Sequence, residues 1–155
     1  MKNIIIIVIL TYLFGTTCMC QNINDQELIQ SFLNEITSNQ DITLEEFSKK
    51  GIFASSINQE VEAQQERESL FSLLAQSVQD EINGCKSLDD RVEILTLEES
   101  KRLKSFDEDL EIPDKGKVYI LFCGNSVITR MLIIDNKIAA ISTLNKSGKL
   151  FFALL

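Results

Sequence analysis

Four runs of β-branched, aromatic and other apolar residues close the chain, and a short turn sequence separates each run from the next. The runs are Lys117 to Cys123, Val127 to Ile134, Ile138 to Leu144 and Lys149 to Leu155. The separators are Gly124-Asn125, Asp135-Asn136 and Asn145-Lys146-Ser147-Gly148, residue types that accept the backbone angles of tight turns. Connections this short leave no room for crossover helices, so the pattern predicts a four-stranded antiparallel meander over about residues 117–155.

A helical pattern precedes these strands. The first helix is indicated by apolar residues at the spacing of one helical face, with Asn24 or Asp25 as its cap and Asn39 near its end. These apolar residues are Leu28, Ile29, Phe32, Leu33 and Ile36. They predict an amphipathic helix that packs against a core.

Two further helices are expected before residue 84. Thr43 and Glu46 form a capping-box pattern for a short helix that Gly51 stops. A longer helix follows another box-like stretch at residues 56–59 and ends at Gly84. Its apolar stripe consists of Leu70, Leu74, Val78 and Ile82. The helical region thus covers about residues 25–84.

The segment from Ser87 to Phe106 fits both a helix and a strand. Arg91 to Leu95 alternates as a strand does, and Thr96 with Glu99 forms a third capping box. We expect a short strand over 91–95 and a helix over about 97–106. Helices followed by strands place residues 21–155 in one α+β domain, with the N-terminal helices packed on the C-terminal meander.

The run Val127 to Ile134 is apolar on both faces. Met131 and Ile133 lie on one face and Leu132 and Ile134 on the other. A sheet with one face in water shows clean alternation, so we expect a second layer over the other face. Helices on both faces are the favoured cover, and a curved sheet, a ligand pocket or a second subunit are the alternatives. The last run has no charged residue after Lys149, so we expect it to be paired or covered, or to join copies of the chain.

Residues 1–20 have the anatomy of a signal peptide. Lys2 is followed by eleven mostly apolar residues from Ile4 to Phe14 and by a stretch of small residues. The apolar part is about half of the roughly 20 residues that cross a bilayer, so an uncleaved anchor is a weaker interpretation, as is an N-terminal element of the domain. The chain is therefore expected to be secreted or periplasmic, with no stable membrane span.

The cleavage region contains Cys18, Cys20 and Gln21. Our preferred site lies after Cys20, so that Gln21 starts the mature chain. Lipid attachment at one of the cysteines is a minor alternative, which would give a lipid-anchored surface protein. The residues before them fit poorly, because Thr17 precedes Cys18 and Met19 precedes Cys20.

Cleavage there leaves Cys85 and Cys123 as the cysteines of the mature chain. In an oxidising compartment two thiols are a candidate disulfide. The alternative is that both are small buried apolar residues, since Cys123 ends an apolar run. A catalytic thiol is disfavoured, because the chain contains no His to activate it.

The mature chain is acidic. Removing Lys2 from the 15 basic residues leaves 14 against 23 acidic ones, so the net charge moves from −8 to −9. Such a chain lacks the basic surface that drives binding to nucleic acid, and anionic lipid repels it. We expect neither as a partner.

Standard catalytic and metal-binding patterns are missing from the sequence. Without His, no Ser-His-Asp triad or His-ligated metal site can form. Asp107, Asp109 and Glu111 alternate as at the start of a calcium loop, but Ile112 and Pro113 stand where that loop needs Gly and a backbone ligand. We therefore expect a solvated acidic loop, with no cofactor, metal or catalytic residue.

The chain resembles uncharacterised small secreted proteins of Bacteroidota. The resemblance rests on Lys2-Asn3 before an Ile-rich region, on Gln21 after the expected cut and on strands that end at the C-terminus. It implies a compartment and no activity. The order of helices before strands also resembles the nuclear-transport-factor-2-like group, which implies a cone-shaped ligand pocket.

These features predict a secreted or periplasmic, non-catalytic domain that binds an unidentified protein or small molecule. One alternative is a small ligand-pocket protein or an enzyme that uses carboxylates, which requires two buried carboxylates in one cavity. The other is a structural component of the cell surface that assembles through its last strand.

Overall fold

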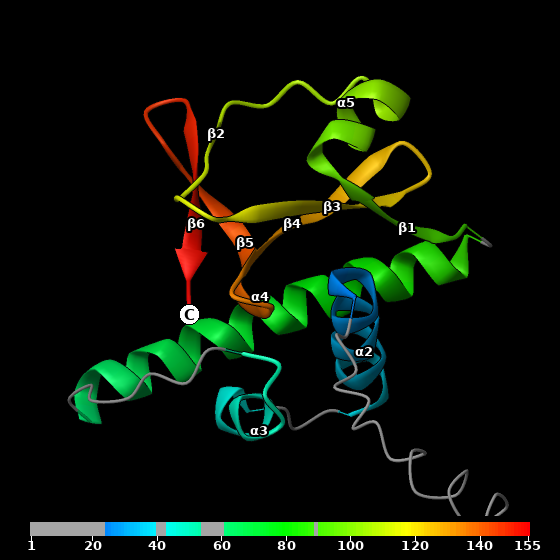
Figure 1. Cartoon of the computed structure of the whole chain (residues 1–155). Helices are drawn as coiled ribbons and strands as arrows, with labels where there is room; N and C mark the ends of the chain where they lie inside the picture. Colours follow the sequence, from blue (N-terminus) through cyan, green and yellow to red (C-terminus); the bar gives the residue numbers. More distant parts are fainter. Residues whose placement is uncertain (1–23, 40–42, 54–60, 89) are drawn as a thin grey trace, which may run out of the picture.

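The computed structural model describes residues 24–39, 43–53, 61–88 and 90–155. These residues form an α+β fold, as the sequence predicts (Figure 1). The helices are α2 (Asp25–Ser38), α3 (Leu44–Lys49), α4 (Val61–Ser87) and α5 (Leu97–Lys104). The strands are β1 (Val92–Thr96), β2 (Leu110–Glu111), β3 (Lys117–Cys123), β4 (Ser126–Ile134), β5 (Lys137–Lys146) and β6 (Lys149–Leu154).

The first two described helices begin where their caps predict. The side chain of Asn24 accepts a hydrogen bond from the backbone N–H of Gln26 at the start of α2. Thr43 Oγ1 accepts one from the N–H of Glu46 at the start of α3. Each cap satisfies an N–H that the helix itself leaves unpaired. All five apolar residues predicted for the inner face of α2 are buried.

Four phenylalanines join these helices. Each of these side chains is at most 1% exposed. They are Phe32 in α2, Phe47 in α3, Phe71 in α4, and Phe53 in the segment after α3. Their ring centroids lie 5.2–5.8 Å apart in tilted and edge-to-face pairs, a geometry that aromatic rings prefer. The cluster links α2, α3 and α4 into one layer.

Helix α4 runs past the predicted end at Gly84. It continues to Ser87, so the predicted helical boundary at residue 84 is wrong by three residues. The last turn carries Cys85, whose side chain is 2% exposed. The apolar environment of Cys85 extends the buried stripe by one turn, and burial outweighs the weak helix propensity of Asn83-Gly84. The box-like stretch at 56–59 lies outside the described residues.

The ambiguous middle segment forms a strand and then a helix, as predicted. Thr96 and Glu99 make a complete capping box at the start of α5. The predicted helix end at Phe106 is wrong, because α5 stops at Lys104. Ser105 adopts a left-handed conformation (φ 52°), and the backbone N–H groups of Ser105 and Phe106 both donate to Ser100 O. This turn directs Phe106 onto the sheet.

The sheet differs from the predicted four-stranded antiparallel meander. Strands β3 to β6 pair antiparallel in chain order, but the sheet has six strands in the order β1-β3-β4-β5-β6-β2, and β2 runs parallel to β6. The prediction missed β2 because this strand has two residues, too few for a periodic pattern. Its position depends on a distant contact, in which Leu150 N donates to Asp109 O at 3.1 Å.

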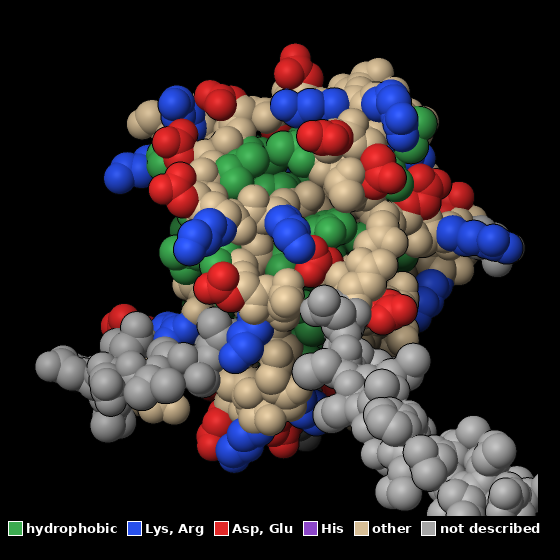
Figure 2. Space-filling view, in the orientation of Figure 1, with side chains coloured by type: hydrophobic (Ala, Val, Ile, Leu, Met, Phe, Trp, Pro, Cys, Tyr) green, Lys and Arg blue, Asp and Glu red, His purple; other side chains and the backbone are tan. Residues whose placement is uncertain are grey.

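Both faces of the sheet are covered, as the two-sided apolar pattern of β4 predicts. Figure 1 shows α2, α3 and α4 on one side and α5 with the segment leading to β2 on the other. Tyr119, Leu121, Met131 and Ile133 pack in the helical cluster, whereas Ile120 and Leu132 pack with Phe106 and other residues on the opposite face. Figure 2 shows hydrophobic side chains of this second side reaching the surface, ringed by charged groups.

Glu108, before β2, and Glu111, within β2, each lie against a cation of the sheet. Arg130 of β4 binds Glu108 through two side-chain nitrogens, with Nε donating to Oε2 at 2.7 Å. Lys149 lies 3.5 Å from Glu111. The two-nitrogen Arg–carboxylate geometry fixes the segment in orientation as well as position.

Leu132→Ala tests whether the second face is a true core. Leu132 is fully buried in the smaller cluster, so removing its side chain should lower the free energy of unfolding by about 2–5 kcal/mol, measured by urea titration with far-UV circular dichroism. Leu103→Ala is the matched control, since Leu103 is 59% exposed and its truncation should change stability by less than about 0.5 kcal/mol. Equal effects of the two variants would contradict a second core.

Candidate functional site

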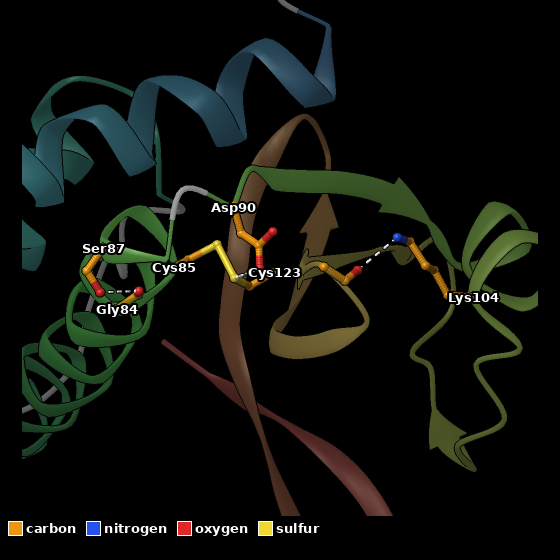
Figure 3. The surroundings of a disulfide bond; sticks show 7 residues. Gly84, Cys85, Ser87, Asp90, Lys104 and Cys123 are labelled. Atoms are coloured by element: carbon orange, nitrogen blue, oxygen red, sulfur yellow. Dashed lines mark hydrogen bonds between the residues drawn. A yellow bond between two sulfur atoms is a disulfide. The ribbon is translucent and has the colours of Figure 1, made fainter.

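Of the residues singled out in the sequence, Cys85 and Cys123 are brought together. Cys85 lies in the last turn of α4 and Cys123 ends β3, and the structure places them at disulfide distance with Cα atoms 5.7 Å apart (Figure 3). Cys18, Cys20 and Gln21 lie outside the described residues. The pair spans 38 residues, and closing such a loop contributes about 4 kcal/mol in the chain-entropy estimate.

The chain leaving α4 is tied down at the same place. The N–H groups of Leu88 and Asp90 both donate to Cys85 O, at 3.1 and 3.3 Å, and Ser87 Oγ donates to Gly84 O at 2.7 Å. These bonds satisfy carbonyls that a helix end leaves unpaired. The connection from α4 to β1 is therefore short and fixed to the disulfide.

A groove of about 360 Å³ lies beside this connection. It is lined by Gln30, Leu33, Asn34 and Thr37 of α2, by Ile82 and Lys86 of α4, and by Asp90, Arg91 and Val92 at the start of β1. Its volume falls in the lower part of the roughly 300–1,000 Å³ range of small-molecule sites.

The lining changes character from floor to rim. Leu33 and Ile82 are 4% and 3% exposed, and Val92 is partly buried. Gln30, Asn34, Lys86 and Arg91 are exposed. An apolar floor with a few polar groups around it is the usual composition of a ligand site.

The α2 wall of the groove is anchored to the sheet by a buried carboxylate. Asp25 is 7% exposed, and its Oδ2 accepts hydrogen bonds from Lys117 Nζ at 2.7 Å and from Tyr119 OH at 3.1 Å. Gln26 adds a long hydrogen bond to Ile94 O at 3.4 Å. Because Asp25 is paired with a cation and a phenol, its burial is compensated.

Carboxylates do not converge in the groove. Asp90 is the one acidic residue of its lining, and Asp25 is the buried carboxylate among the described residues. The described residues also hold no group of three His, Cys, Asp or Glu side chains placed to ligate a metal.

Sequence reasoning missed this groove. Its lining residues come from three elements and are spread over the sequence from Gln30 to Val92. Leu33 and Ile82 fit the apolar stripes of their own helices, and such stripes do not indicate a groove. Lys86 next to Cys85 was the nearest signal, because a disulfide fixes the neighbouring residues in place.

Comparisons with protein-family models, curated proteins and solved structures found no match. In the described part of the chain, no helix has the length and apolar character needed to span a membrane.

The contact with Asp25 leads us to expect that the Tyr119 phenol titrates at a higher pH than a free tyrosine. Burial of the phenol, followed by the hydrogen bond and the charge of Asp25, raises the pKa of Tyr119 to about 12 from 10.0. The folded state therefore binds this proton more tightly than the unfolded state, and the stability it contributes is present below pH 10 and lost as the pH rises from 10 towards 12.

Phenolate absorbance measures this directly. The chain contains Tyr12 and Tyr119, so a chain beginning at Gln21 reports Tyr119 alone. Its folded midpoint should lie near pH 12, and unfolding in guanidinium should return it to about 10. Asp25→Asn should lower the folded midpoint, because both contributions of the carboxylate charge are removed. A folded midpoint near 10 in the unsubstituted chain would contradict the contact.

Proposed function

We propose that the protein is a secreted or periplasmic, non-catalytic binding domain, and that the groove between α2, α4 and β1 is its ligand site. The observation that carries this proposal is the groove itself: an apolar floor with a polar rim, framed by the Cys85–Cys123 pair on one side and by the Asp25 contact on the other. Walls fixed in this way need little reordering when a ligand binds, which favours affinity.

The proposed compartment is supported by two features. The first is the signal-peptide anatomy of residues 1–20, with Gln21 as the expected first residue of the mature chain. The second is the Cys85–Cys123 pair at disulfide distance, since disulfides persist in oxidising compartments. The resemblance to small secreted proteins of Bacteroidota agrees with both.

Intact mass spectrometry of the secreted chain tests the compartment and the disulfide together. Without reductant, we expect a mass that starts near Gln21 and gains no alkyl group from a thiol reagent, whereas after reduction two alkyl groups should add, at Cys85 and Cys123. An unprocessed or lipid-modified mass would contradict a soluble secreted domain. Light scattering on the same sample should give a monomeric mass, and an assembly would favour the structural alternative, in which copies join through β6.

A blocking substitution tests the groove. Asn34 is exposed on the groove side of α2, so Asn34→Trp should fill the opening without disturbing the core. Fragments that bind the chain from Gln21 onward, detected by saturation-transfer NMR, should lose binding at least about tenfold in this variant. Ser31→Trp is the matched control, because Ser31 is exposed on the same helix and does not line the groove.

The outcomes of this screen separate the alternatives. Fragment binding that survives Asn34→Trp, or no fragment binding at all, would contradict the groove as the ligand site. A binding site formed around two converging carboxylates would instead support the carboxylate-dependent enzyme.

A further inference from the structure

We infer that the ligand of this groove is a small organic acid, with one carboxylate bound by Lys86 and Arg91 and an apolar body seated on Leu33, Ile82 and Val92. This inference rests on the proposed function, since it names the chemical class of ligand for the same site.

Lys86 and Arg91 are not paired with a described carboxylate, whereas several other cations of the described chain are. Six other basic side chains each lie against a carboxylate: Lys49, Lys50, Lys104, Lys117, Arg130 and Lys149. Lys86 and Arg91 form no ion pair with any residue in the described ranges. They are also the two cations that line the groove. A bound anion would therefore supply a counter-charge to two cations that none of the described carboxylates pairs with.

The acidic residue of the described lining, Asp90, has its carboxylate next to the disulfide. Asp90 Oδ2 lies 3.9 Å from Cys123 Sγ, and a Cβ added at Gly124 would lie 3.4 Å from the same oxygen. Figure 3 shows Asp90 beside Cys123. The Asp90 carboxylate thus lies beside the end of β3. Among the described lining residues two cations stand against one carboxylate, although the whole chain carries −8.

The floor requires an apolar body on the ligand. Leu33 and Ile82 are almost fully buried and belong to the main core, and Val92 packs against that core. Covering such a floor with apolar atoms is favourable in proportion to the area removed from water. Inorganic anions lack this apolar part, whereas an alkyl or aryl carboxylate has both a negative charge and an apolar part. Charge-assisted hydrogen bonds from Lys and Arg are roughly twice as strong as neutral ones, so the carboxylate end adds affinity and fixes orientation.

The backbone that carries the two cations is fixed before a ligand arrives. Lys86 directly follows Cys85, and Arg91 directly follows Asp90, whose N–H donates to Cys85 O. Arg91 then leads into Val92, which pairs with Cys123 in the sheet. Both backbone positions are thus fixed relative to the disulfide, which lowers the entropic cost of closing on a carboxylate.

Octanoate is a suitable probe, with octanamide as its neutral match. Each is titrated into the oxidised chain from Gln21 onward by isothermal calorimetry, below the concentration at which the probe aggregates. Octanoate should bind about tenfold or more tightly than octanamide, and added salt should weaken octanoate selectively, because salt screens exposed charges. The double variant Lys86→Gln with Arg91→Gln should remove the preference for octanoate.

The control variant is Lys101→Gln with Arg102→Gln, which removes two exposed cations of α5 that do not line the groove. It changes the net charge equally and should keep the preference for octanoate. Circular dichroism melting checks that each variant folds.

The outcomes distinguish this inference from the proposed function. Equal binding of octanoate and octanamide that Asn34→Trp abolishes would overturn the carboxylate inference while the groove stands as a site. Binding of neutral fragments in the groove without binding of octanoate would likewise overturn the carboxylate inference and leave the groove as a site. If neither probe nor any fragment binds, the proposed function itself fails. An octanoate preference lost equally in both double variants would also overturn the inference, because it would reflect net charge alone.

Discussion

The two central strands are apolar on both faces, and the remaining structure follows from covering them. β3 and β4 bury Ile120 and Leu132 on one side and Leu121 and Met131 on the other. Leaving either face in water would forfeit the hydrophobic stabilisation of that side. The helices before the sheet cover one face, and α5 with the segment up to β2 covers the other. A charge pair, Arg130 with Glu108, holds this second cover in place.

The groove lies between α2, the end of α4 and the start of β1. Two contacts fix its walls to the sheet. The Asp25 contact with Lys117 and Tyr119 holds the start of α2 on β3, and the Cys85–Cys123 pair holds the end of α4 on the end of the same strand. One strand, β3, thus supports both walls of the groove.

Sequence patterns within a few residues predicted most helices and strands. Contacts between distant residues determined β2 and the end of α4, which these patterns did not predict. The caps at Asn24, Thr43 and Thr96 define helix starts because capping depends on residues at most three apart. β2 could not be predicted, because two residues pair with β6 only after the chain has folded over the second face. The end of α4 was misplaced for a similar reason, since burial of Cys85 outweighed Gly84. Counting cysteines gave Cys85 and Cys123 as a candidate pair, and the fold places them at disulfide distance. The groove requires three elements to meet, and the sequence pattern of none of them signals it.

The charge of the chain and the charge of the groove act over different distances. A net charge of −8 repels anions at long range, but at physiological salt the screening length is only about 8 Å. Within the groove, Lys86 and Arg91 outnumber Asp90 in the described lining, so the local charge attracts an anion once it has arrived. Long-range electrostatic steering would therefore not raise the association rate of an organic acid. Selectivity would come from a slower dissociation rate, because the apolar floor and the two cations both hold the bound ligand. Inorganic anions meet the same long-range repulsion and make no contact with the apolar floor that would retain them. An acidic chain with a cationic groove can therefore discriminate among anions by their apolar part.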